Sequence, residues 1–194
     1  MTMLLLGLLI FLGLHSLRIV AEPTRTRWRE RLGEQRYKGL YTVLSLGGFG
    51  LICWGFGLAR QTPVVLWDTP AAMRHVAALL TWPAFILLAA SHAKGNAIKA
   101  QVGHPMVIGT ALWALGHLLA NNTLAEVCLF GSFLLWSLAS WQAARRRDRL
   151  QPPAPVVVRT RATVITVLAG TAVWLAFALW GHRWLIGVAP FVRP

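Results

Sequence analysis

The chain has 194 residues, of which 56% are hydrophobic and only 13% are charged, and its mean hydropathy is +0.57. This composition excludes an ordinary soluble domain, which carries about twice that share of charged residues. The net charge of +13 does not indicate nucleic-acid binding, because the basic residues cluster between apolar runs. The sequence therefore predicts an integral membrane protein with no nucleic-acid partner.

Apolar runs of helix length follow one another along the chain, and about twenty such residues cross a bilayer core of about 30 Å. We expect six helices, at about residues 2–20, 39–59, 71–92, 105–120, 124–143 and 162–180. Thr123 and Glu126 have the spacing of a capping box at the start of the fifth helix. The prediction is an all-α fold, a polytopic membrane protein with a bundle of about six transmembrane helices in one domain, residues 1–194.

Lysine and arginine are distributed unevenly between the connections. The first, third and fifth connections hold six, two and six of them, fourteen in total, against four on the opposite side. The excess favours a cytoplasmic location for these connections and places both termini outside. Residues 144–161 then form a basic, Pro-rich cytoplasmic connection with an extended stretch at 152–155. We expect the basic connections to contact anionic lipid head groups.

Histidine is costly at membrane depth unless it is paired, so a histidine there marks a candidate site. His75 and His182 lie at or beyond the ends of the expected helices, which indicates solvated side chains. The other four histidines lie within helices or at their ends, and they are His15, His92, His104 and His117.

His104 and His117 cannot bind one metal ion from a single straight helix, because thirteen residues separate them by about 20 Å and about 140°. The sequence contains no HExxH motif and no pair of carboxylates within the apolar runs, so it does not indicate another kind of metal centre. Ligation of a haem b by two histidines from different helices is one interpretation of the pattern. The other interpretation is that each histidine only forms a hydrogen bond to a neighbouring helix, which stabilises the fold by about 0.6 to 2 kcal/mol.

Several sequence blocks together resemble the NnrU family of bacterial membrane proteins. The match covers about residues 13–148, and its most specific part is the block HPM…WALGHLLAN that begins at His104. The supporting residues are His15-Ser16, Gly33-Glu34, Tyr37, Gly39-Leu40-Tyr41, Phe130-Gly131-Ser132-Phe133 and Arg146-Arg147. The resemblance implies a location in the bacterial inner membrane and an association with nitric oxide metabolism and denitrification.

The family is related to plant 15-cis-zeta-carotene isomerase, a membrane enzyme that uses haem b. The resemblance implies that His15 and His117 are the axial ligands of a haem iron, and that His104 matches the enzyme's His-Pro position. Ala114 stands where that isomerase has a cysteine, so exchange to a thiolate ligand is not implied for this chain.

The expected topology allows two ligand pairs. The Cα atoms of His15 and His117 would differ in depth by about 10 Å, which suits a haem axis tilted toward the membrane normal. His15 and His104 match better in depth and form the alternative pair, and His92 is a further candidate at a helix end. Three functions stay open: an isomerase acting on an apolar unsaturated substrate, a haem carrier for electron transfer, sensing or assembly, and a cofactor-free scaffold or transporter.

Overall fold

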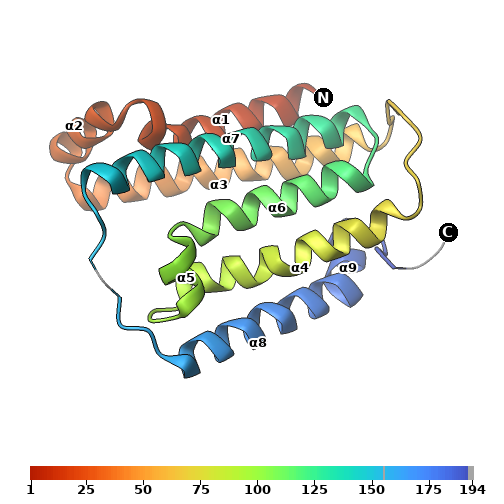
Figure 1. The fold of residues 1–194 in the computed structure, drawn as a ribbon. Coiled ribbons are helices and arrows are strands. Elements are labelled where there is room, and N and C mark those ends of the chain that lie inside the picture. Colours follow the sequence, from red (N-terminus) through yellow and green to blue (C-terminus); the bar gives the residue numbers. More distant parts are fainter. Residues whose placement is uncertain (155, 192–194) are drawn as a thin grey trace.

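The computed structural model describes residues 1–154 and 156–191, and the described part is helical apart from short connections (Figure 1). The elements are α1 (Thr2–Val20), α2 (Glu22–Leu32), α3 (Glu34–Ala59), α4 (Met73–His92), α5 (Ala97–Val102), α6 (Pro105–Ala120), α7 (Leu124–Leu150), α8 (Thr160–Ala176), the π-helix η1 (Phe177–Gly181) and α9 (His182–Ile186). The all-α polytopic membrane fold expected from the sequence is confirmed.

In the described part of the chain, five helical segments are long and apolar enough to cross a bilayer, and they begin at Thr2, Glu34, Met73, Leu124 and Thr160. Helix α6 is shorter, with 16 residues, and packs between α7 and α4. Each of the five long segments exposes large apolar side chains, for example Leu9, Leu46, Leu79, Leu135 and Leu168. A soluble monomer rarely exposes so much apolar surface, whereas lipid covers it in a membrane.

The long helices pack side by side in the order α3, α1, α7, α6, α4, α8. In Figure 1, α1, α3 and α7 form one group, and α6 connects it to α4 and α8. Helices α2 and α5 and the α7–α8 connection lie at one end, which carries most of the lysines and arginines and is called the basic end below. The start of α1 and helix α9 lie at the opposite end.

Glycines allow close approach of α1 and α3. A Cβ atom added to Gly7 would lie 2.6 Å from the backbone nitrogen of Ile52, and one added to Gly48 would lie 3.0 Å from that of Phe11. Small residues at helix contacts are the usual way for membrane helices to maximise van der Waals packing. The buried core includes Leu4 of α1, which is fully enclosed against this contact.

The helix boundaries agree with the sequence in some places and differ in others. The capping box is confirmed, because the Thr123 side chain accepts from the Glu126 backbone and the Glu126 carboxylate accepts from the Thr123 backbone. Helix α3 begins five residues earlier than expected, and α7 continues to Leu150 because no residue stops a helix before Pro152. Residues 144–150 of the basic segment are therefore helical.

Two further differences concern segments outside the long helices. The first connection forms α2, a polar helix with no buried residue. Pro23 lies in its first turn, and Gly33, at φ 76°, separates it from α3. In the last connection, Gln151 to Ala154 have no helix, as expected, and Pro155 lies outside the described residues. The last apolar run is not one regular helix either, because α8 passes into η1 at Phe177.

Candidate functional site

Two cavities lie at opposite ends of the helix bundle, and each is lined by two histidines. The first cavity, at the basic end, has a volume of about 780 Å³ and is lined by His15 and His104. The second cavity, at the other end, has a volume of about 570 Å³ and is lined by His117 and His182. Both volumes lie in the range of about 300–1,000 Å³ that is typical of small-molecule sites.

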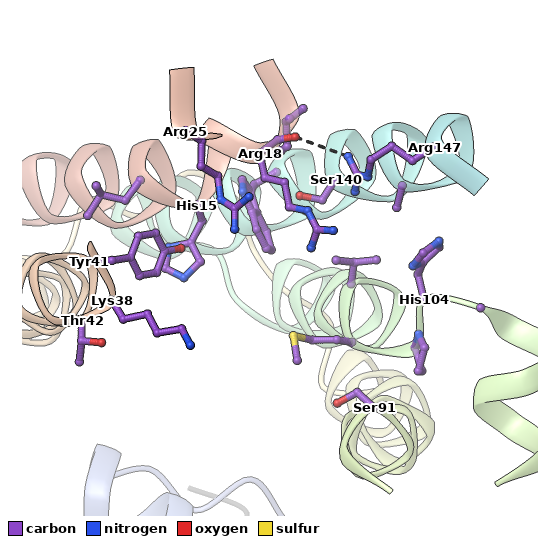
Figure 2. A pocket seen from close by; sticks show the side chains of 18 of the residues that line it. His15, Arg18, Arg25, Lys38, Tyr41, Thr42, Ser91, His104, Ser140 and Arg147 are labelled. Carbon is purple, nitrogen blue, oxygen red and sulfur yellow. Dashed lines mark hydrogen bonds between the residues drawn. The ribbon is translucent and has the colours of Figure 1, made fainter. Parts of the chain in front are cut away.

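His15 extends from α1 into the first cavity, where it faces aromatic side chains of α3 and α7 (Figure 2). Its Nδ1 lies 2.7 Å from the carbonyl oxygen of Phe11, one turn earlier. Because a carbonyl can only accept, Nδ1 carries the hydrogen and donates it, and Nε2 keeps its lone pair. Tyr41 lies 5.4 Å and Trp136 6.0 Å from the imidazole, measured between ring centroids.

His104 lines the same cavity but uses its ring differently. It precedes α6 as the N-cap residue, and its Nε2 lies 2.7 Å from Oδ2 of Asp148 on α7. Both side chains are about one-quarter exposed, so this contact ties the start of α6 to the end of α7. The structure thus brings the alternative pair, His15 and His104, to one cavity, with the Nε2 of His104 already engaged.

The second cavity combines the end of α6 with the start of α4 and the C-terminal segment. Its lining is rich in aromatic side chains, namely Phe85, Trp113, Trp174, Phe177 and Phe191. The indole nitrogen of Trp174 donates to the hydroxyl of Thr81 at 3.1 Å, which links α8 to α4 beside the cavity. Arg74, at the start of α4, contributes a guanidinium group to the lining.

His117 and His182 lie close together in this cavity. Their ring centroids are 6.4 Å apart, and the ring planes differ by only 18°. His117 donates Nδ1–H to the carbonyl of Trp113 at 2.8 Å, and His182 donates Nδ1–H to that of Val188 at 2.8 Å. Within residues 1–154 and 156–191, no hydrogen bond engages either Nε2, so both lone pairs are free to bind a metal ion.

Irregular backbone positions His182. The π-helix η1 ends at Gly181, directly before this histidine, and π-helical turns often occur at functional sites. Gly187 has φ 78° and ψ 9°, a left-handed conformation that ends α9 and turns the chain back. Val188 follows and accepts the Nδ1–H of His182, and Arg60, directly after α3, donates to the carbonyl of Ile186 at 2.6 Å.

The structure places His15 and His117 in separate cavities. Aromatic rings lie between them, in a series from Phe11 through Phe133 to Trp113 with centroid separations of 6.0 and 5.7 Å. Phe11 stacks on His15 at 4.3 Å, and Trp113 contacts His117 at 5.2 Å. A ligand seated between the two imidazoles would have to displace these packed rings.

Two other residues considered in the sequence lie away from both cavities. His92, at the end of α4, is exposed and is not among the lining residues. Ala114 is fully buried in the core cluster and lines neither cavity.

The sequence interpretation missed His182, because its position near the end of an apolar run indicated a solvated side chain. The available signal was Gly187 followed by Pro190, which indicates a chain reversal that can carry residues back over a helix end.

These observations define an all-α, multi-pass membrane protein with a histidine-lined cavity at each end of the helix bundle. The chain belongs to the NnrU family, since the family model described as "NnrU protein" matches residues 3–190, nearly the whole length. The resemblance found in the sequence is thereby confirmed. No curated protein and no solved structure matches the chain.

Proposed function

We propose that the protein binds one haem b in the second cavity, with His117 and His182 as the axial ligands of the iron. The observation that carries this proposal is the pair of near-parallel imidazoles with centroids 6.4 Å apart. Two metal–nitrogen bonds of about 2 Å each, added to two half-rings, span roughly 6–7 Å. The spacing therefore fits a single metal ion between the two rings.

The hydrogen bonds of both rings support the same role. A histidine that ligates a metal usually donates its other ring N–H to a carbonyl or carboxylate, which fixes the tautomer and the ring orientation. His117 and His182 both do so, through Trp113 and Val188. Neutral imidazoles also bring no charge into a cavity lined mostly by apolar residues.

The number of ligands favours haem over a bare metal ion. A structural zinc site needs four protein ligands and a catalytic one needs three. No group of three or more His, Cys, Asp or Glu residues able to hold a metal ion occurs in the described part of the chain. Haem requires only axial protein ligands, because the porphyrin supplies the other four nitrogens.

Haem b, when bound, supplies one-electron redox chemistry. His117 and His182 would both hold the iron, so a substrate could not bind to it directly. We therefore favour an electron-transfer, sensor or assembly role, of the kind expected for a factor linked to nitric oxide metabolism, over an isomerase acting on an apolar unsaturated substrate. An isomerase would require one of the two imidazoles to leave the iron first.

Haem content tests the proposal. Purified wild-type protein is expected to contain about one haem per chain, measured by extraction and haemochrome absorbance. His117→Ala is expected to lose most of it, whereas His15→Ala, in the first cavity, is expected to retain it. Loss of haem in His15→Ala with retention in His117→Ala would assign the haem to the first cavity and contradict the proposal.

We also propose that the basic end faces the cytoplasm of a bacterial inner membrane, with both termini in the periplasm. The excess of lysine and arginine on the connections at that end supports this orientation. A periplasm-dependent reporter enzyme fused after Arg60 is expected to be active, and one fused after Leu150 is expected to be inactive. The reverse pattern would contradict the orientation.

A further inference from the structure

The first cavity has features that the haem proposal does not use. Five lysine and arginine residues line it, and none of its described lining residues is acidic; the five are Arg18, Arg25, Lys38, Lys99 and Arg147. In Figure 2, Arg18 and Arg25 extend from above into the space between α3 and α6, and Lys38 reaches into it from α3. The basic groups thus converge on a hollow from several separate helices.

Carboxylates neutralise only part of this charge. Glu22 accepts from Arg25 at 2.8 Å, and Glu34 lies 2.7 Å from the ammonium group of Lys38. The other three cations have no carboxylate partner within residues 1–154 and 156–191; they are Arg18, Lys99 and Arg147. Two of them donate to backbone carbonyls: Lys99 to that of Ser91 at 2.8 Å and Arg147 to that of Arg18 at 3.4 Å.

The lining changes from charged to apolar with depth. On α1, Arg18 lies near the basic end and Leu14 one turn deeper; on α7, Arg147 lies near that end and Trp136 three turns deeper. On α3, Lys38 precedes Tyr41 in the same direction. A binding site for a small soluble anion does not need apolar residues below its basic groups. A binding site for an amphiphile with an anionic head group does need them, because they contact the apolar part of the ligand.

The row of helices is open beside this cavity. Helix α3 packs on α1 and α2, and α8, at the other end of the row, packs on α4, α5 and η1, so within the described residues these two end helices form no helix–helix contact beside the cavity. Deeper along the cavity-facing side of α3, Leu46 and Phe49 lie one and two turns after Thr42 and are 64% and 51% exposed. An acyl or isoprenoid chain can therefore leave the cavity sideways into the bilayer.

We propose that the first cavity binds the phosphate-bearing head group of an anionic membrane lipid, with its apolar tail extending along α3 into the bilayer. Arg18 and Arg147 supply guanidinium groups, whose fork of N–H donors suits phosphate oxygens. Lys99 adds an ammonium group from α5, and Tyr41 and Trp136 line the deeper part. This inference is independent of haem in the second cavity.

Native mass spectrometry of the full chain, titrated with phosphatidylglycerol or phosphatidylcholine, tests the inference. One phosphatidylglycerol is expected to bind about tenfold or more tightly than phosphatidylcholine. The double variant R18Q/R147Q is expected to lose about tenfold in phosphatidylglycerol affinity. The matched control R31Q/R149Q removes two exposed arginines that do not line the cavity, and its affinity is expected to stay within about twofold of wild type.

Three outcomes would overturn the inference. Equal losses in both double variants would show a diffuse basic surface instead of a site. Displacement of the bound lipid by millimolar inorganic phosphate would identify a soluble anion as the ligand. Loss of the haem absorbance in His15→Ala with retention in His182→Ala would assign this cavity to haem, and would contradict the haem proposal at the same time.

Discussion

Replacing His182 with glycine is expected to abolish the low-spin, six-coordinate signal of the haem iron, because this signal requires both axial imidazoles. His117→Gly is expected to do the same, and the double variant is expected to be colourless. Absorption and electron paramagnetic resonance spectra of the purified variants measure the change. Added imidazole is expected to restore the low-spin signal in His182→Gly, which a histidine of purely structural importance would not show.

A matched control is available in His92, which is exposed at the end of α4 and lines neither cavity. His92→Gly is expected to leave the spectrum unchanged. Persistence of the low-spin signal in His182→Gly would contradict the assignment of this ligand. Should His15→Gly abolish the signal in that case, the iron would belong to the first cavity.

Replacing Gly55 with alanine is expected to destabilise the bundle by about 1–3 kcal/mol or more, the cost of overpacking a close contact. The added Cβ would lie 2.6 Å from the carbonyl carbon of Met3 and against the backbone of Leu4, so α1 and α3 would have to separate. Backbone atoms cannot move aside as a flexible side chain can. The free energy of unfolding in detergent micelles or bicelles measures the effect.

Gly57 provides the control on the same helix, two residues later. Nothing lies within 4 Å of a Cβ atom added there. Gly57→Ala is expected to be neutral or to stabilise the protein by up to about 1 kcal/mol, because alanine has the higher helix propensity. Equal unfolding free energies for the two variants would contradict the close packing of α1 on α3.

The sequence was sufficient for the fold class because long apolar runs leave few alternatives in a bilayer, where backbone polar groups must be satisfied within helices. The capping box at Thr123 also followed from local spacing alone. Helix α2 could not be predicted from the sequence, because its charged residues form no apolar face and indicate a loop equally well. The extension of α7 to Leu150 does not follow from hydropathy, because the apolar run ends near residue 143, whereas the arginines after it are good helix formers.

The candidate site was predictable only in part. His15, His104 and His117 were found because each lies in or beside an apolar run, and all three line a cavity. Their grouping depends on helix order, which hydropathy does not determine: α7 lies between α1 and α6 and inserts Phe133 between His15 and His117. The position of His182 beside His117 depends on a π-helical turn and a left-handed glycine in the last segment. Neither feature produces a periodic pattern in the sequence.

The absorption spectrum of the purified wild-type protein, prepared from cells with sufficient haem, tests the central claim most directly. A Soret band with the visible bands of low-spin, six-coordinate iron is the predicted result, because His117 and His182 would hold the iron from both sides. A colourless preparation that is folded and stable would contradict haem binding, and a high-spin spectrum would contradict ligation by both histidines.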